Sequence, residues 1–300
     1  MKSLLCAVAL AALPLSGWAG EVEVPTATGT VAVQTEPQKL VVLDLAALDT
    51  LDALGVRADG APAIKPPAYL AEAMAGLPTV GTLFEPDFEA LAAMGPDLIV
   101  AGGRSRTQIQ PLSAIAPTLD MTIDGTDLIA EVRERTAAYG TIFGREAQAA
   151  EAIAALDAEI EKTRAAMAGK GRALILLTNG GKMSAYGAGS RFGWLHDALG
   201  LPPADPELKV ANHGEAVSFE YVAQLDPDWI LVIDRGAAVD QGGEAAAATL
   251  DNPLIAKTTA GQKGRIVYLD GAAMYLATGG LRAVTGTLQQ LAEAFGAAEG

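Results

Sequence analysis

The sequence predicts an α/β protein with two similar lobes, each built on a parallel sheet, joined by one long helix. Strand and helix patterns alternate along the chain, one pattern occurs twice, and a long helical segment separates the two copies. The length of 300 residues agrees with about two domains of about 150 residues. Hydrophobic residues make up 50% of the chain, which is enough for two cores and excludes an intrinsically disordered protein.

Residues 1–19 are typical of a cleavable signal peptide. Lys2 is followed by an apolar stretch without acidic residues, and Gly17 and Ala19 fit the small-x-small pattern of a cleavage site. An N-terminal membrane helix is the alternative, although the apolar stretch is short for a span. The single cysteine, Cys6, lies in this segment, so the exported chain has no disulfide. We therefore expect a protein of the bacterial periplasm.

The N-terminal lobe is expected over residues 20–144. Alternating apolar and polar residues on both sides of a Pro/Gly turn predict a hairpin at its start. A continuous apolar run and a helical pattern that ends at Gly55 then form one βα unit. The elements expected in this lobe are strands at 21–24, 31–34, 40–43 and 97–101 and helices at 45–54 and 86–94.

The connecting helix is expected over residues 145–168. This segment contains neither Gly nor Pro, and Ile153, Leu156 and Ile160 lie on one apolar face. At about 1.5 Å per residue the helix is about 36 Å long, which is enough to cross from one lobe to the other. Gly169 ends it.

The C-terminal lobe is expected over residues 169–300 and repeats the first. Residues 88–104 align with residues 219–235 at one constant offset and without a gap. Each copy contains a helical pattern, Pro-Asp, a strand and a final arginine. The elements expected in this lobe are strands at 173–178, 229–233 and 266–269 and helices at 190–199, 219–225 and from about 281.

Three arginines lie where ligand binding is expected. Arg104 and Arg235 follow strands at equivalent places in the two copies, and ligands of open α/β sheets bind beyond the carboxyl ends of strands. Arg191 follows Ser190, the expected N-cap of a helix, where a cation opposes the helix dipole. In a chain of net charge −15 they indicate an anionic ligand held by forked hydrogen bonds. The alternative is that each pairs with a nearby acid on the surface.

Loop residues supply candidate metal ligands. His213 lies in a polar loop and Tyr275 in the loop after the last strand, whereas His196 is expected to be a structural or surface residue. A hard ferric ion accepts one phenolate and one imidazole, while two histidines are too few for a three-histidine zinc site. The alternative for Tyr275 is an ordinary packed tyrosine.

Charge and missing motifs exclude several classes of function. The net charge of −15 disfavours nucleic acid and anionic lipid as the main partner. The chain has no Gly-x-Ser-x-Gly elbow, no phosphate-binding loop ending in Lys-Ser/Thr and no His-Glu-x-x-His. We therefore expect a binding cleft between the lobes and not an enzyme.

Five segments carry a resemblance to a known family: VVLDLAALDTLDALGV, FEPDFEALAAMGPDLIVAGGR, SRFGWLHDALGL, NHGEAVSFEYVAQLDPDWILVIDRG and LDNPLIAKT. The chain resembles the periplasmic substrate-binding proteins of iron-siderophore ABC transporters, the class III proteins with chelatase-like lobes and a single-helix hinge. The last four segments are similar to the catecholate-siderophore branch. The resemblance implies a ferric siderophore as ligand, no intrinsic cofactor, an inner-membrane ABC permease as partner and a monomeric protein.

The resemblance also implies roles for individual residues. Arg104, Arg191 and Arg235 match three cleft arginines that bind ferric catecholates. His213 and Tyr275 match a loop histidine and a loop tyrosine that complete the iron shell of tetradentate siderophores. The segment just before Tyr275 has fewer aromatic residues than relatives often carry, so the identity of the siderophore is left open.

Acidic residues are implied to dock the permease. Glu85 matches the acid of the first lobe, and Glu215 or Glu220 is the candidate in the second. Two other functions stay open at this point. A haem or corrinoid carrier of the same superfamily would use His213 or Tyr275 as an axial ligand, and an exported hydrolase would use His213 with a carboxylate.

Overall fold

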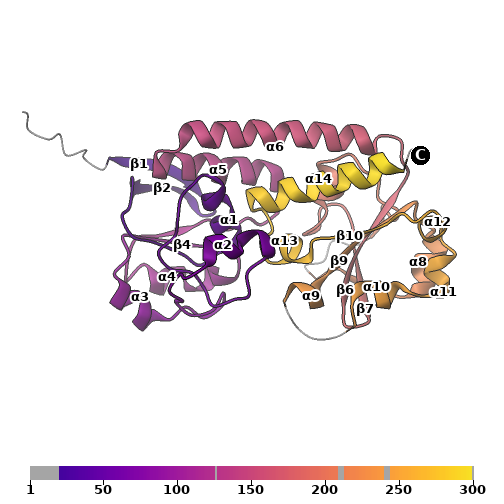
Figure 1. The fold of residues 1–300 in the computed structure, drawn as a ribbon, viewed down its shortest axis with the longest axis horizontal. Coiled ribbons are helices and arrows are strands. Elements are labelled where there is room, and N and C mark those ends of the chain that lie inside the picture. Colours follow the sequence, from indigo (N-terminus) through magenta and orange to yellow (C-terminus); the bar gives the residue numbers. More distant parts are fainter. Residues whose placement is uncertain (1–19, 126, 209–212, 240–243, 299–300) are drawn as a thin grey trace, which may run out of the picture.

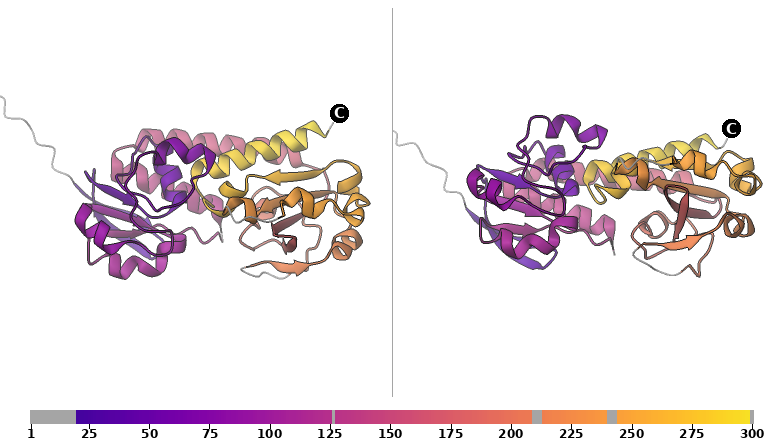
Figure 2. Two further views of the ribbon diagram at one scale, coloured as in Figure 1. Left: turned by 60° about the horizontal axis from the view of Figure 1, so that its bottom comes forward. Right: turned by 90° about the horizontal axis from the view of Figure 1, so that it is seen from below.

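Two lobes, each with its own sheet, lie side by side in the computed structural model, and the long helix α6 (Glu146–Met167) runs along both (Figures 1 and 2). The structure describes residues 20–125, 127–208, 213–239 and 244–298. The expected signal peptide, residues 1–19, lies outside these ranges. Within them, no helix has the length and apolar character needed to cross a membrane.

The N-terminal lobe is built on a three-stranded parallel sheet of order β3-β4-β5, with an antiparallel hairpin, β1–β2, beside it. The expected hairpin, strands and helices are present, and the structure adds the helix α5, which packs on β1 and α6. The elements are β1 (Glu21–Thr26), β2 (Gly29–Gln34), β3 (Leu40–Val42), α1 (Leu45–Ala53), α2 (Ala71–Met74), α3 (Phe88–Met94), β4 (Leu98–Ala101), α4 (Ile109–Leu112), β5 (Thr118–Asp120) and α5 (Leu128–Phe143), with 3-10 helices at Ala68–Leu70 and Gly103–Gln108.

The C-terminal lobe is built on a five-stranded sheet of order β10-β9-β6-β7-β8. Strands β6, β9 and β10 are parallel, as expected, whereas β7 and β8 form an antiparallel edge that the sequence did not predict. The elements are β6 (Ala173–Asn179), β7 (Lys182–Tyr186), α7 (Trp194–Asp197), β8 (Glu215–Val217), α8 (Phe219–Leu225), β9 (Trp229–Asp234), α9 (Arg235–Ala238), α10 (Ala246–Leu250), α11 (Pro253–Ala256), α12 (Thr259–Gln262), β10 (Ile266–Leu269), α13 (Gly271–Tyr275) and α14 (Leu281–Ala297).

The sequence repeat is also a structural repeat, because α3 and α8 have equivalent bounds and equivalent caps. Asp87 accepts the backbone N–H of the third helical residue of α3 at 2.9 Å, and Ser218 does the same for α8 at 3.3 Å. Both helices end on a left-handed residue, Gly95 in one and Asp226 in the other. Asp226 tolerates this conformation while its carboxylate accepts hydrogen bonds from the backbone N–H and the hydroxyl of Thr259.

Helix α6 contributes to the cores of both lobes. Ala149, near its start, is buried with the core of the N-terminal lobe, and Leu156 and Ile160 are buried with the core of the C-terminal lobe. The helix expected over 145–168 is therefore present, and one continuous helix connects the two packed cores. Such an element resists bending between the lobes.

Helix α14 forms a second link between the lobes. It packs along α6, and its first turn has no side-chain cap of its own. Asp49 of α1 accepts the backbone N–H groups of Arg282 at 2.8 Å and Ala283 at 2.9 Å, and the Thr50 hydroxyl accepts that of Leu281. Asp49 is fully buried, and this burial raises its pKa to about 6 although both N–H groups favour the charged form. The N-terminal lobe thus caps a helix of the C-terminal lobe.

Candidate ligand-binding site

A cavity of about 330 Å³ lies between the lobes. The loops that follow β3, β4 and β5 form one wall, as expected for the carboxyl ends of parallel strands. The segment at the end of α13 and the turn before α7 form the other wall. The lining residues are Asp44, Ala46, Phe84, Gly103, Arg104, Ile123, Asp124 and Gly125 of the N-terminal lobe and Arg191, Tyr275, Leu276 and Thr278 of the C-terminal lobe.

Tyr275 lies among the three arginines that the sequence singled out. The guanidinium carbons of Arg104, Arg191 and Arg235 lie 5.3, 4.6 and 5.3 Å from the centre of its ring. These distances are within the range of cation–π contacts. We call Arg104, Arg191, Arg235 and Tyr275 the arginine–tyrosine cluster. Four of the five candidate ligand-binding residues thus lie together, all except His213. Three of these four line the cavity, and the fourth, Arg235, lies beside it.

Hydrogen bonds hold the cluster together. Arg104 donates across the cavity to the carbonyl oxygens of Tyr275 at 2.8 Å and Leu276 at 3.3 Å. Arg191 donates through Nη2 to the same Tyr275 carbonyl at 2.8 Å and to the Thr278 hydroxyl at 3.3 Å. Arg235 Nε donates to the Tyr275 phenol oxygen at 2.9 Å. Each arginine is therefore oriented by the segment that carries Tyr275.

The cluster favours negative charge. Burial opposes ionisation of Tyr275, but the hydrogen bond from Arg235 and the positive charges of Arg235, Arg191 and Arg104 lower its pKa below the usual 10. Burial and the charge of Arg104 lower the pKa of Arg191. A site that makes a phenol more acidic and holds a poorly solvated guanidinium is suited to an anionic ligand.

Phe84 adds an aromatic surface that the sequence analysis missed. Its side chain lines the cavity although it is 61% exposed, and the Arg104 guanidinium lies 6.0 Å from its ring centre. An exposed phenylalanine at a cavity offers a flat apolar surface to an aromatic ligand. The only signal in the sequence was an aromatic residue in the loop just before a predicted helix.

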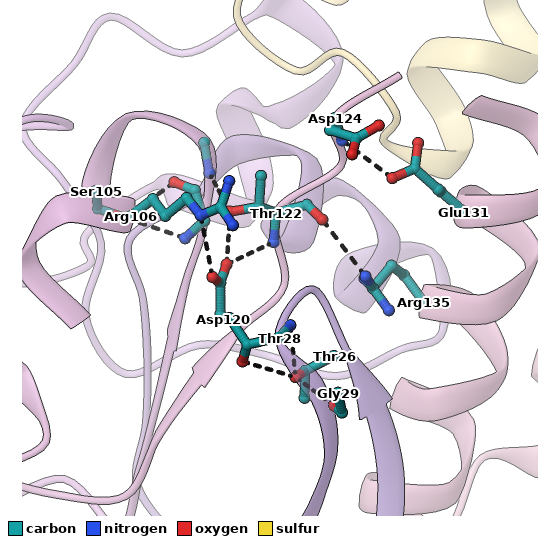
Figure 3. A network of polar contacts seen from close by, with 12 residues as sticks. Thr26, Thr28, Gly29, Ser105, Arg106, Asp120, Thr122, Asp124, Glu131 and Arg135 are labelled. Atoms are coloured by element: carbon teal, nitrogen blue, oxygen red, sulfur yellow. Dashed lines mark hydrogen bonds and ion pairs between the residues drawn. The ribbon is translucent and has the colours of Figure 1, made fainter. Parts of the chain in front are cut away.

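A buried polar network shapes the loop that carries Arg104 (Figure 3). Asp120 accepts a hydrogen bond from the Thr122 hydroxyl at 2.5 Å and lies 3.3 Å from Arg106 Nε. The same hydroxyl oxygen accepts the backbone N–H of Gly103 at 3.1 Å. Asp120 is 4% exposed, so its partners determine the shape of this wall.

Two carboxylates also line the cavity, and the sequence analysis did not select them. Asp44 Oδ1 accepts the Ala47 N–H at 2.9 Å and so caps α1. Asp124 is exposed, and Glu131 holds its loop by accepting the backbone N–H groups of Asp124 at 3.0 Å and Gly125 at 2.9 Å (Figure 3). Burial raises the pKa of Glu131.

The local structure around Arg191 and Tyr275 corrects two expectations. The helix expected at 190–199 is only α7, which begins at Trp194, and the Ser190 hydroxyl donates to the Gly187 carbonyl instead of capping a helix. Arg191 therefore lies in a turn, and the argument from the helix dipole was wrong although the arginine does line the cavity. Tyr275 is the last residue of α13 and not a loop residue, because Asp270 caps a short helix there.

The two histidines differ in their surroundings. His196 is buried, and its Nδ1 lies 2.9 Å from the Leu201 carbonyl, in line with a structural role. His213 is exposed in the turn before β8 and does not line the cavity. The next residue, Gly214, lies against Tyr186, where an added Cβ would come within 2.6 Å of the ring. Ligation of iron by His213 thus stays a prediction. In the part of the chain that the structure describes, no group of three or more His, Cys, Asp or Glu is placed to hold a metal.

The candidate docking acids are exposed on both lobes. Glu85 lies in the loop before α3, Glu215 lies on the edge strand β8, and Glu220 lies in the first turn of α8. Their role in docking also stays a prediction.

Two lobes on one rigid helix and an arginine-rich cavity between them define a two-lobed binding protein. Residues 40–273 match a family model described as "Periplasmic binding protein". The chain therefore belongs to the periplasmic binding protein family. It is a binding protein and not an enzyme, which excludes the exported hydrolase considered above.

Similar proteins support the same fold over nearly the whole chain. The petrobactin-binding protein YclQ of Bacillus subtilis is 35% identical over 267 residues, which cover 86% of this chain and 83% of the relative. The ferric-anguibactin-binding protein FatB of Vibrio anguillarum is 30% identical over 256 residues, which cover 83% of this chain and 79% of the relative.

Solved structures agree with this result. The crystal structure of YclQ superposes with a TM-score of 0.88 at 32% identity, and covers 92% of this chain and 99% of its own. The catecholate-siderophore-binding protein VctP of Vibrio cholerae superposes with a TM-score of 0.84 at 30% identity, and covers 93% of this chain and 100% of its own. The predicted class of two α/β lobes with parallel sheets and one connecting helix is confirmed.

Proposed function

We propose that this protein binds a ferric siderophore of the catecholate type and delivers it to an inner-membrane ABC permease. The observation that carries the proposal is the arginine–tyrosine cluster at the cavity between the lobes. The similar proteins include binders of petrobactin, ferric anguibactin and catecholate siderophores, which supports this choice over haem or a corrinoid.

The cluster suits the charge of such a ligand. Catecholate oxygens are deprotonated when they bind ferric iron, so the complex is an anion. Arg191 uses only Nη2 for its hydrogen bonds with the described residues, so Nε and Nη1 can each donate a separate hydrogen bond to a ligand oxygen. Phe84 offers its ring to an aromatic group of the ligand. Charge complementarity then supplies affinity and rapid capture.

Tyr275 is the proposed iron ligand of the protein. A siderophore with four donor atoms leaves two iron positions open, and a phenolate is a hard donor that ferric iron prefers. The lowered pKa of Tyr275 makes the phenolate more accessible. Its oxygen accepts a hydrogen bond from Arg235 Nε, and this bond can remain while a second lone pair binds iron. His213 is the proposed second iron ligand, and it has to move from its exposed turn toward the cavity to bind the iron.

The proposed organisation follows from the same reasoning. Residues 1–19 direct export to the periplasm and are removed, and the lobes over 20–144 and 169–300 are held by the connecting helix over 145–168. We expect small lobe motions because α6 and α14 both cross the interface. The protein acts as a monomer, and Glu85 with Glu215 or Glu220 contacts the permease.

A fluorescence titration tests the proposal. Trp194 is buried three residues from Arg191, so a ferric bis-catecholate in the cavity is expected to quench its emission. Saturable quenching, together with a change in the ligand-to-metal absorption band that Tyr275→Phe removes, is the expected result. Quenching without that change would contradict iron ligation by Tyr275 only. Saturable binding of haem, with a shifted Soret band, in place of catecholates would overturn the proposed ligand.

A further inference from the structure

The segment that carries Arg104 has a flexible backbone by composition. Gly102 and Gly103 directly precede Arg104, and Gly103 has a φ of 51°, a left-handed conformation that glycine enters and leaves at little cost. Arg104 nevertheless holds its guanidinium at the cavity, where it donates to the carbonyl oxygens of Tyr275 and Leu276. Contacts from outside the segment therefore have to hold its backbone in one conformation.

Two tethers hold this backbone, one on each side of Arg104, and both end on the carboxylate of Asp120 (Figure 3). On one side, the Gly103 N–H donates to the Thr122 hydroxyl oxygen at 3.1 Å, and this hydroxyl donates to Asp120 Oδ1 at 2.5 Å. On the other side, Arg106 Nε lies 3.3 Å from Asp120 Oδ2. One buried carboxylate thus holds the residue before Arg104 and the residue two positions after it.

Ser105 closes the turn between the two tethers. Its hydroxyl, in a fully buried residue, accepts the Gly102 N–H at 3.1 Å and donates to the Gly102 carbonyl at 3.0 Å. A Cβ on residue 102 would come within 3.0 Å of the backbone nitrogen of Thr122. The turn that carries Arg104 therefore lies directly against the loop that follows β5.

Asp120 and Thr122 are themselves anchored to regular structure. The Asp120 carbonyl accepts the Ala27 N–H from the turn of the β1–β2 hairpin at 2.8 Å. The Thr122 carbonyl accepts a hydrogen bond from Arg135 Nη2 of α5 at 3.4 Å (Figure 3). The buried Arg135 also donates to the Pro25 carbonyl of β1 at 3.3 Å. The tethers therefore end on a part of the lobe that is held by a hairpin and a helix, and not on another loop.

We propose that Asp120 and Thr122 are positioning residues, which act on ligand binding through Arg104. Neither is among the residues that line the cavity, so their effect on a ligand is indirect. By holding the backbone at Gly103 and Arg106, they keep Arg104 in its binding position before the ligand arrives, and binding then does not have to order it. This inference rests on the proposed function and extends it to residues outside the cavity.

Thr122→Val tests the first tether, because valine keeps the branched shape of threonine and removes the hydroxyl. The Gly103 N–H then loses its acceptor, and the turn spends time in conformations that misplace Arg104. In a fluorescence titration, binding of a ferric bis-catecholate should weaken by about threefold to about tenfold, the range of one neutral hydrogen bond. Thr122→Ser keeps the hydroxyl and should bind like the wild type. Thr118→Val is the matched control, because Thr118 lies on β5 outside the cavity and donates to the Ala116 carbonyl at 2.9 Å; it should leave the affinity unchanged.

The Arg104→Met background separates positioning from a general structural role. A residue that acts through Arg104 has no further effect once the guanidinium is gone, so Thr122→Val should not weaken binding further in this background. A residue that only stabilises the N-terminal lobe would weaken binding by the same factor with and without Arg104.

Three results would overturn this inference and leave the proposed function intact. They are an unchanged affinity in Thr122→Val, a loss of the same size in Thr122→Ser or Thr118→Val, and a loss that persists in the Arg104→Met background. Failure of the wild-type protein to bind the ferric bis-catecholate would overturn the proposed function itself.

Arg106→Met keeps the test decisive if thermal unfolding shows that Thr122→Val does not fold. The Arg106 side chain is 51% exposed, and its replacement removes only the second tether. It should weaken binding in the wild-type background and not in the Arg104→Met background. An unchanged affinity in Arg106→Met, or a loss that is the same in both backgrounds, would contradict the role of the second tether.

Discussion

Replacement of Arg191 by methionine should weaken binding of a ferric bis-catecholate by about tenfold to about a hundredfold. Methionine keeps an unbranched apolar side chain of similar length and removes the charge. Nη2 already donates to the Tyr275 carbonyl and the Thr278 hydroxyl, so Nε and Nη1 are the donors that remain for the ligand. A hydrogen bond from a charged donor contributes about 1.5 to about 3 kcal/mol, which converts to the stated range of affinity.

The assay is a fluorescence titration at two ionic strengths. The wild-type protein should lose affinity as NaCl rises from about 50 mM to about 500 mM, and Arg191→Met should lose less, since one screened attraction is gone. Arg133→Met is the matched control: Arg133 pairs with Asp157 between α5 and α6 at 2.5 Å and does not line the cavity. An unchanged dissociation constant in Arg191→Met, or the same loss in Arg133→Met, would refute the role of the cluster in binding.

Four further outcomes are expected. Tyr275 should ionise at a lower pH than the other five tyrosines, because burial raises the pKa of each of those. In an ultraviolet pH titration, Tyr275→Phe should lose the first phenolate signal. Arg235→Met should move that signal to higher pH. Asp49→Ala should lower the free energy of unfolding in urea by about 2 kcal/mol or more, as two backbone N–H groups lose their buried acceptor. Because the pKa of Asp49 rises from 3.8 to about 6 on folding, the stability of the wild type relative to Asp49→Asn should fall as pH rises through 6. A gain in this relative stability over the same pH range would contradict the raised pKa of Asp49. Small-angle scattering should show little compaction when ligand binds, whereas a large decrease in the radius of gyration would contradict a rigid connection through α6.

The sequence predicted those parts of the fold that depend on local patterns. The bounds of α8 and β10 agree with the prediction, and α6 differs from it by one residue at each end. The repeat was visible because α3 and α8 use the same spacing of cap, apolar face and following strand. Antiparallel β8 was missed because it has only three residues and is mostly exposed, so its sequence has no hydrophobic periodicity.

The sequence allowed the arginines of the candidate site to be predicted but not its carboxylates. Arg104 and Arg235 were found from their equivalent places after strands, which is a property of the chain order. Asp44 was not recognisable as a site residue because its sequence context is that of an N-cap, and only the order of the strands places it beside Arg104. Phe84 could not be predicted as a site residue, because its sequence does not show that its loop reaches the cavity. Arg191 was selected with an incorrect helix boundary, and its position became clear only from the turn that precedes α7.

In the proposed binding mode, a ferric siderophore lies between Arg104 and Arg191 with its iron facing Tyr275. The most direct test is X-ray diffraction at the iron absorption edge from crystals grown with a ferric bis-catecholate. We expect one strong anomalous peak inside the cavity between the lobes, next to the Tyr275 phenol oxygen. A peak elsewhere on the molecule, or a well-ordered complex that leaves this cavity empty, would contradict it.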